Sequence, residues 1–323
     1  MLYPLTFEPR LKQRVWGGRN LARLFGKSLP GLDPIGEAWE ITDRPGDVSV
    51  IRNGPLAGKD LRWLLEQGPA RILGNAKSLN GRFPLLIKLL DAREKLSLQV
   101  HPPAARAAQL GGEPKTELWY VAEGAPGAEL YVGLKRGVTR EHFERQIRDG
   151  SVADCFHRLP VRAGDAMFLP SGRVHAIGAG LVLFEIQQNS DTTYRVFDWN
   201  RVGLDGRPRE LHVAQSLASI DFDDVEPRLV GSAFADEAGL RWRVLVRDAL
   251  FTVQEVIAPA GATVPLAPGL MQILAVVSGR LAVVFDRDRL ILTAGQFCLV
   301  PAAIEGVTLH PETECRWLRT TAG

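Results

Sequence analysis

The feature that most limits the folds open to this chain is a long succession of short apolar or alternating segments, bounded by glycine, proline, aspartate or asparagine. Segments of this length and pattern predict β-strands separated by turns. Stretches with helical spacing are too few to connect many parallel strands, so an antiparallel sandwich or barrel is favoured. The predicted strands cover residues 48–51, 96–100, 118–121, 166–169, 181–186, 244–246, 251–257, 273–277 and 281–285.

Helices are predicted in only four stretches, at residues 20–27, 61–66, 140–149 and 210–218, where apolar residues recur with helical spacing. Asp60 and Thr139 immediately precede two of these stretches. A carboxylate or hydroxyl oxygen at that position accepts a hydrogen bond from a free N–H group of the first turn. We therefore expect a mainly β protein with a few helices, inserted between strands and at the N-terminal side.

Part of the sequence occurs twice. The run Ala163–Pro170 is similar to Ala294–Pro301, and upstream of it four residues recur at one constant spacing: Gln99, His101, Glu117 and Gly124 align with Gln254, Val256, Gln272 and Gly279. The repeat predicts two barrels, a first domain at residues 1–220 that carries the helical insertions and a second domain at residues 221–323. A chance similarity between short apolar strands is the alternative explanation.

The first copy contains donors for a divalent metal ion. Two imidazoles, a carboxylate and an amide, drawn from separate strands, suit a catalytic cation, and here they are His101, His175, Glu117 and Gln99. The second copy aligns Val256, Gly306, Gln272 and Gln254 with them, so we expect only the first barrel to bind metal. Gln99 could instead be an ordinary strand amide. The remaining histidines have no such company and are expected to face solvent: His142, His157, His212 and His310.

Composition argues against several kinds of partner and location. The chain has 39 Lys and Arg against 37 Asp and Glu, and the formal charge of +2 gives no electrostatic reason to expect nucleic acid or an anionic membrane. The three cysteines are too widely spaced for a disulfide framework or a zinc ribbon. No segment resembles a signal peptide or approaches the roughly 20 apolar residues of a membrane span, so we expect a cytoplasmic protein.

Two motifs resemble those of the cupin superfamily, namely Glu117 with Gly124, and Gly164 with Pro170, Gly172 and His175. The first motif departs from the usual form, because Gln99-Val100-His101 replaces His-x-His and the gap to Glu117 is longer. This departure resembles type I mannose-6-phosphate isomerases in their short bacterial form. The same resemblance extends over Ile87–Pro102, Lys115–Tyr120, Gly172–Ala176 and Glu185–Asp198, and covers residues 1–220 well and the remainder loosely.

The resemblance implies two cupin-type antiparallel jelly-roll barrels and an enzyme of carbohydrate metabolism that interconverts mannose 6-phosphate and fructose 6-phosphate through an enediol. It implies one Zn²⁺ per chain, an active-site role for Arg195, and a small sugar phosphate as the partner of a monomer or weak homo-oligomer. The implied metal ligands are Gln99, His101, Glu117 and His175. A sugar-binding cupin without catalysis and a cupin oxygenase are the alternatives.

The chemistry of such a reaction suggests further roles. Arg195 keeps its proton, so it can stabilise an enediolate or bind substrate oxygens but is a poor base. Glu185 and Lys115 are candidates for the proton transfer, with a metal-bound water as a third. Glu185 could instead be a buried carboxylate paired with Arg195. Because the chain lacks a glycine-rich phosphate loop, scattered cations should bind the phosphate, with Lys88, Lys115, Arg195 and Arg201 as candidates.

Overall fold

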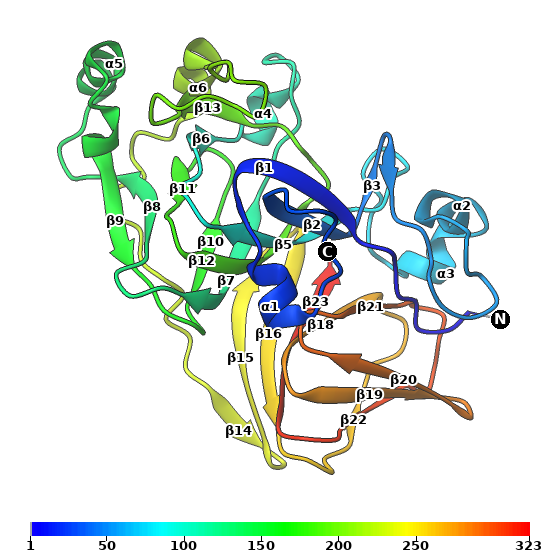
Figure 1. Ribbon diagram of the computed structural model, residues 1–323. Helices are drawn as coiled ribbons and strands as arrows, with labels where there is room; N and C mark the ends of the chain where they lie inside the picture. Colours follow the sequence, from blue (N-terminus) through cyan, green and yellow to red (C-terminus); the bar gives the residue numbers. More distant parts are fainter. Residues whose placement is uncertain (1) are drawn as a thin grey trace.

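Two antiparallel sheets form the upper barrel in Figure 1, seen in a computed structural model that describes residues 2–323. One sheet has six strands in the order β1 (Arg10–Gly18), β2 (Ile35–Ile41), β5 (Leu85–Ala92), β12 (Leu181–Gln188), β7 (Glu117–Gly124) and β10 (Ala166–Leu169). The other has five, in the order β13 (Tyr194–Phe197), β6 (Leu98–Val100), β11 (His175–Ile177), β8 (Glu129–Leu134) and β9 (Phe156–Pro160).

Two further antiparallel sheets form the second, lower barrel (Figure 1). Its six-stranded sheet has the order β14 (Ala235–Glu237), β15 (Leu240–Arg247), β16 (Phe251–Ala258), β23 (Cys315–Ala322), β18 (Gln272–Ser278) and β21 (Phe297–Val300). Its four-stranded sheet has the order β17 (Val264–Pro265), β22 (Thr308–Pro311), β19 (Arg280–Phe285) and β20 (Asp288–Thr293). Strands β3 (Asp43–Arg44) and β4 (Asp47–Val48) form a small hairpin. The mainly β fold with two cupin barrels is thus confirmed.

Short helices connect these strands: α1 (Asn20–Phe25), α2 (Leu61–Glu66), α3 (Pro69–Leu73), α4 (Ala104–Ala107), α5 (Arg140–Asp149), α6 (Val213–Ser219) and a 3-10 turn at Val152–Cys155. Both predicted caps are confirmed, because Asp60 accepts from the Trp63 N–H and Thr139 accepts from the His142 N–H. The first helix is shorter than predicted because Gly26, in the left-handed conformation, ends it. Helix α6 begins three residues later than predicted, since residues 210–212 lie against strand β13 instead.

Side chains alternate between two kinds of core along the central strands. In β7, Trp119 and Val121 point into the first barrel, whereas Leu118 and Tyr120 point toward the second barrel. The outer faces of the two six-stranded sheets share one apolar core with the N-terminal segment, and each barrel has an apolar core of its own. The inward-facing positions of the first barrel are therefore where a buried polar site can be built.

A buried carboxylate fastens the two barrels together. Glu255 of β16 is fully buried and accepts from the hydroxyl of Tyr120 in the first barrel at 2.7 Å. It also accepts from Arg243 at 2.6 Å and Arg316 at 3.0 Å. Arg243 in turn donates to the carbonyl of Gly164 in the first barrel at 2.5 Å. A buried charge needs such partners, so this cluster holds the barrels in one relative orientation.

Strand pairing corrects part of the predicted repeat. Glu117 and Gln272 do correspond, because each begins the matching strand, β7 or β18, and pairs with the end of β10 or β21. In contrast, β16, which contains Gln254, occupies the place of β5 and not of β6. Gln99 pairs with His175 in the first barrel, as Val264 pairs with Leu309 in the second. The alignments of Gln99 with Gln254 and of His175 with Gly306 were therefore wrong.

The same correction assigns a counterpart to His101. This residue lies two positions after Gln99, so its counterpart is Leu266, two positions after Val264, and not Val256. The predicted register failed because short apolar strands resemble one another in sequence, and only the pairing tells them apart.

None of the helices among residues 2–323 has the length and apolar character that a membrane-spanning helix requires.

Candidate active site

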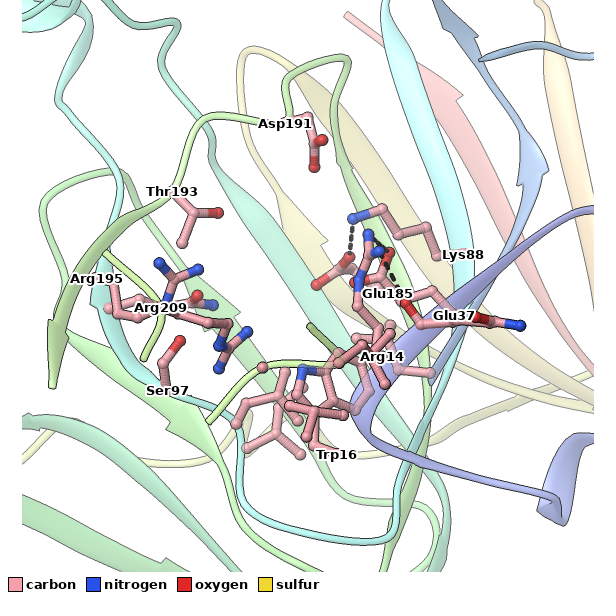
Figure 2. Close-up of a pocket in the computed structure, with 18 of the residues that line it drawn as sticks. Arg14, Trp16, Glu37, Lys88, Ser97, Glu185, Asp191, Thr193, Arg195 and Arg209 are labelled. Atoms are coloured by element: carbon pink, nitrogen blue, oxygen red, sulfur yellow. Dashed lines mark hydrogen bonds and ion pairs between the residues drawn. The ribbon is translucent and has the colours of Figure 1, made fainter. Parts of the chain in front are cut away.

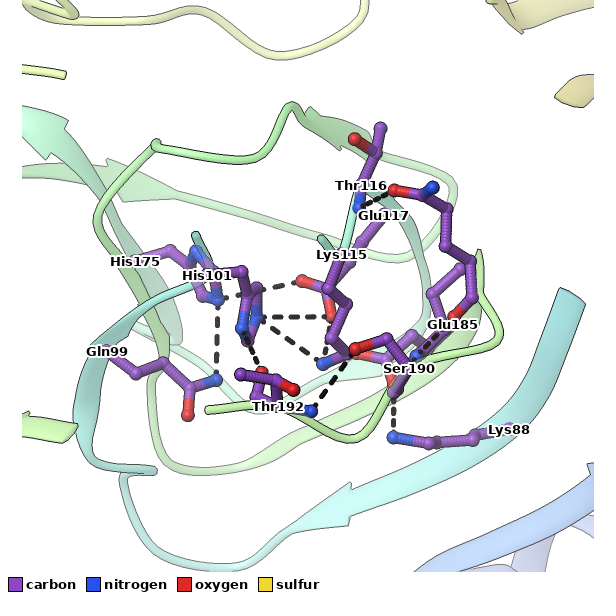
Figure 3. A network of polar contacts seen from close by, with 12 residues as sticks. Lys88, Gln99, His101, Lys115, Thr116, Glu117, His175, Glu185, Ser190 and Thr192 are labelled. Atoms are coloured by element: carbon purple, nitrogen blue, oxygen red, sulfur yellow. Dashed lines mark hydrogen bonds and ion pairs between the residues drawn. The ribbon is translucent and has the colours of Figure 1, made fainter. Parts of the chain in front are cut away.

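Three potential metal ligands meet inside the first barrel (Figure 3). His101 directly follows β6, while Glu117 and His175 are the first residues of β7 and β11. All three are buried, and their ligand atoms lie within 4.8 Å of one another. The carboxylate of Glu117 is between the rings, with Oε1 3.5 Å from His101 Nε2 and Oε2 3.6 Å from His175 Nε2. The three predicted histidine and glutamate ligands thus converge.

The protonation states of this cluster suit a cation. Burial lowers the pKa of His175 to about 3, with His101 adding to the effect, and burial followed by Lys115 lowers the pKa of His101. Burial alone would raise the pKa of Glu117, but Lys115 and the two histidines hold it well below its usual range. Two neutral imidazoles and one carboxylate are the forms that bind a metal.

Hydrogen bonds orient both rings toward the centre of the cluster. His101 Nδ1 donates to the carbonyl of Thr192 at 2.7 Å, and His175 Nδ1 donates to the carbonyl of Arg173 at 2.9 Å. Each ring therefore keeps the lone pair of Nε2 for the centre, which is the arrangement that carbonyl acceptors impose on metal-binding histidines. Both oxygens of Glu117 are buried without a hydrogen bond, although Lys115 forms an ion pair with Oε1. Buried acceptors left open in this way fit a metal ion.

Gln99 lies beside the cluster, with its side-chain Nε2 3.3 Å from His175 Nε2. In this orientation the amide donates to the ring, whereas ligation would use the amide oxygen and requires a half-turn of the amide group. The residue is near enough to serve either role. Its assignment as a fourth ligand stays a prediction.

A cavity of about 550 Å³ opens beside the cluster and is lined by Gln99, Lys115 and Glu185 among others (Figure 2). On one side of it, the Lys88 ammonium and the Glu185 carboxylate form a buried ion pair at 3.0 Å. The indole N–H of Trp119 donates to the other oxygen of Glu185 at 2.9 Å. The alternative that Glu185 pairs with Arg195 is wrong, because adjacent strands β5 and β12 place Lys88 directly opposite it.

A second carboxylate supports the charge of Lys88. Glu37 of β2 accepts from the indole of Trp39 at 2.7 Å and from Arg14 at 3.0 Å. Burial would raise the pKa of Glu37, but Lys88, Arg14 and Trp39 lower it to about 2. Burial likewise opposes the charge of Lys88, and Glu185 and Glu37 outweigh it, so the pKa of Lys88 is raised. The cavity therefore contains a fixed ammonium between two carboxylates.

The opposite side of the cavity is basic, with Arg195, Arg209, Ser97 and Thr193 close together (Figure 2). Asp198 accepts from Arg209 at 2.5 Å and from Arg201 at 3.0 Å. Among residues 2–323, no carboxylate pairs with Arg195 in this way, and its buried Nε lacks a hydrogen-bond partner. Burial, and then the charge of Arg209, lowers the pKa of Arg195. The wall carries more positive than negative charge and can receive an anion.

Sequence reasoning found some residues of this cavity and missed others. Lys88, Lys115, Glu185 and Arg195 line it as expected, whereas Arg201 is held by Asp198 and the Lys95 carbonyl and lies outside the lining. The residues that were not predicted are Arg14, Trp16, Glu37, Ser97 and Arg209. Ser97 lies within the run Ile87–Pro102 and Glu37 in a segment that also resembles the family, so the resemblance could have revealed both; Arg14, Trp16 and Arg209 lie far from the motifs and carry no local signal.

Comparisons with known proteins agree with this geometry. Residues 5–120 match the family described as phosphomannose isomerase type I, catalytic domain. The chain is 39% identical over 254 residues to the mannose-6-phosphate isomerase of Streptococcus mutans, covering 78% of each chain. It is 39% identical over 227 residues to mannose-6-phosphate isomerase ManA of Bacillus subtilis, covering 70% of each.

The structural likeness extends over the whole length. The crystal structure of mannose 6-phosphate isomerase from Bacillus subtilis matches with a TM-score of 0.90 and 30% identity, over 99% of both chains. A structure from Archaeoglobus fulgidus, described as a putative mannosephosphate isomerase, shares the fold with a TM-score of 0.77 and 23% identity. These relatives show, in agreement with the paired motifs and the ligand cluster, that the chain belongs to the type I mannose-6-phosphate isomerase family.

Proposed function

We propose that the protein interconverts mannose 6-phosphate and fructose 6-phosphate through an enediol. One observation carries this proposal: a cluster ready to bind a cation lies beside a cavity that contains the buried Lys88–Glu185 ion pair and a basic wall. An aldose–ketose isomerase needs all three, because a proton moves between C1 and C2, negative charge develops on the oxygens, and the phosphate must be held.

The metal is proposed to be one Zn²⁺ per chain. His101, Glu117 and His175 would hold it, with Gln99 as a fourth ligand, and the single carboxylate would leave the site with net positive charge. When bound, such a cation supplies Lewis-acid stabilisation of the charge that develops on the sugar oxygens. In support, a phosphomannose isomerase of the same fold, 18% identical to this chain, was solved bound with zinc and yttrium.

Proton transfer is proposed to involve Glu185 of β12 or Lys115, which lies just before the neighbouring strand β7; both line the cavity. Both oxygens of Glu185 are engaged, one by Trp119 and one by Lys88, so this carboxylate is held in a fixed place. Lys115 Nζ lies 3.4 Å from His101 Nε2 and forms an ion pair with Glu117, which places it next to the ligand cluster. Each group is buried and positioned, as a general acid or base requires.

The phosphate is proposed to bind at the basic wall. Arg195 and Arg209 line the cavity there, and a guanidinium offers a planar fork that matches a phosphate. Ser97 adds a hydroxyl on the same side (Figure 2). The reacting carbons would then point toward the ligand cluster, because Lys115 and Gln99 line the cavity on that side. Arg195 lies directly opposite Gln99 in the pairing of β13 with β6, so it would also stabilise the enediolate.

The chain is further proposed to act in the cytoplasm, as a monomer or a weak homo-oligomer, with its two barrels divided near residue 220. In support of a reducing compartment, the three cysteines are free and buried. In support of the division, α6 still packs against β13 and β6 of the first barrel, and the sheets of the second barrel begin with β14.

The decisive experiment couples metal analysis of the purified protein to an isomerase assay with mannose 6-phosphate, before and after chelation and after adding Zn²⁺ back. We expect about one zinc per chain, loss of turnover on chelation and recovery with zinc. Full turnover by protein verified to be metal-free would refute the proposal. Substrate binding without turnover would favour the sugar-binding alternative, and oxygen-dependent consumption of the sugar would favour the oxygenase.

A further inference from the structure

His212 contacts the main chain of Arg195 although sequence reasoning expected it to face solvent. Strand β13 is the edge of its sheet, so only one side of it pairs with another strand, β6. On the free side, the His212 N–H donates to the Arg195 carbonyl at 2.8 Å, and the Arg195 N–H donates to Nδ1 of the His212 ring at 3.2 Å. His212 thus satisfies both main-chain groups that an edge strand normally leaves open.

This contact fixes the position of Arg195 beside the ligand cluster. Arg195 is paired with Gln99 of β6. Because its N–H and carbonyl both point to His212, the pair with Gln99 is of the non-hydrogen-bonded kind, in which opposite side chains are closest. The neighbouring loop adds a third contact, since the Arg195 guanidinium donates to the Glu210 carbonyl at 2.7 Å. The segment 210–212 therefore contacts both the main chain and the guanidinium group of this arginine.

The orientation of the His212 ring is itself set by its neighbours. The ring lies against that of Tyr194, with centroids 6.0 Å apart, and Tyr194 is anchored by its hydroxyl, which donates to the Leu110 carbonyl at 2.7 Å. Nε2 faces the carboxylate of Glu210 at 3.9 Å. The proton of the neutral ring therefore belongs on Nε2, which leaves Nδ1 as the acceptor for Arg195.

We propose that His212 is a positioning residue for the isomerase reaction, acting through Arg195. The proposal rests on the proposed function, because it requires Arg195 to act on the substrate. Without the Nδ1 acceptor, the Arg195 N–H loses its partner on the sheet edge, and the strand is no longer held against residue 212 on that side. A displacement of about 1 Å in a group that orients the substrate can cost on the order of 100-fold in rate.

A matched pair of variants tests the acceptor itself. His212→Asn keeps an acceptor at the position of Nδ1 but removes the ring, whereas His212→Phe keeps the ring contact with Tyr194 but removes the acceptor. We expect kcat/KM to fall about 10- to 100-fold in His212→Phe and to stay within about threefold of the original in His212→Asn. Metal content should be unchanged in both, and thermal unfolding identifies any variant that fails to fold.

A double-mutant cycle with Arg195→Lys then separates positioning from general stability. We expect His212→Phe to cost little further activity in the Arg195→Lys background, because the group that it positions is already altered. Equal losses in both backgrounds, equal losses in the Asn and Phe variants, undiminished activity in His212→Phe, or loss of metal from it would each overturn the inference. An original protein without isomerase activity would instead refute the proposed function, so the two failures can be told apart.

Discussion

The two barrels share one strand order but differ in the polarity of their equivalent inward-facing residues. The strand order β2-β5-β12-β7-β10 of the first recurs as β15-β16-β23-β18-β21 in the second, and β6-β11-β8-β9 recurs as β17-β22-β19-β20. Where the first barrel has Gln99, His101, Glu117 and His175, the second has Val264, Leu266, Gln272 and Leu309. The second barrel packs its three aliphatic residues into an apolar core.

The buried ion pair beside the ligand cluster differs in the same way. Lys88 and Glu185 are directly opposite on β5 and β12, and Gln254 and Arg319 are directly opposite on the matching strands of the second barrel. Arg319 donates to the amide oxygen of Gln254 at 3.0 Å, so a polar pair persists there without a carboxylate. The framework thus comes from strand order and alternation, whereas the chemistry depends on a few inward-facing positions.

The largest effect is expected when the carboxylate at residue 117 of the first barrel is replaced by the amide found at the equivalent position of the second. Glu117→Gln copies Gln272, removes the only carboxylate of the ligand cluster, and should lower both bound zinc and kcat/KM, the latter by about 1,000-fold. Glu123→Gln, a partly exposed position on the same strand that pairs with Arg23, is the control and should keep normal activity. Zinc analysis and the isomerase assay check both. Normal turnover in Glu117→Gln would contradict the assigned role of this carboxylate.

The metal-free protein should lose unfolding free energy in acid because of the two buried histidines of its first barrel, which the second barrel replaces with aliphatic residues. In the fold, the pKa of His175 is lowered from 6.5 to about 3, and that of His101 is lowered too. Unfolded histidines bind protons below pH 6.5, so the stability present at neutral pH is lost as the pH falls from 6.5 toward 3. For His175 alone the loss is on the order of 4 kcal/mol.

Urea unfolding of the chelated protein at a series of pH values measures this loss. The double variant His101→Leu/His175→Leu copies the aliphatic residues of the second barrel and carries no buried imidazole at these positions. Its unfolding free energy should therefore depend much less on pH between 6.5 and 4. An equally steep dependence in both proteins would show that other groups govern acid unfolding.

How far the sequence could predict this molecule depended on whether a signal was local. Glu117, Gly124 and His175 lie in motifs with fixed spacing, so the ligand cluster and the cupin fold followed from them. Helix caps such as Asp60 also depend only on neighbours and were predicted correctly. The register of the repeat was not local, because it depends on which strands pair, and short apolar strands look alike.

The residues that escaped prediction are those that converge from distant segments. Arg209 and Arg14 reach the cavity from opposite ends of the catalytic barrel sequence, and nothing around either marks it as different from the many surface arginines. His212 escaped for a similar reason. Its partner is the main chain of an edge strand 17 residues earlier, and a contact between a side chain and a backbone group so far away in the sequence leaves no local pattern.

A smaller effect is expected from moving the polar pair of the second barrel into the first. Lys88→Gln combined with Glu185→Arg should fold, because the same pair occupies the matching ladder position in the second barrel. It should lower kcat/KM by about 100-fold while leaving the zinc content unchanged, since the fixed ammonium and carboxylate are lost from the cavity. Activity close to normal would show that neither Lys88 nor Glu185 takes part in the reaction.

The smallest effect is expected from Leu309→Met in the second barrel, which is compared with the same substitution at the equivalent position of the first. Leu309→Met nearly conserves volume in an apolar core and should cost less than about 1.5 kcal/mol of unfolding free energy, with unchanged kcat/KM. His175→Met, its counterpart, removes a member of the ligand cluster and should lower zinc content and kcat/KM about as much as Glu117→Gln, even though the chain still folds. Thermal unfolding and the isomerase assay measure both variants. If Leu309→Met lowered kcat/KM as well, the apolar barrel would have to contribute to catalysis, and the division of chemistry between the two barrels would fail.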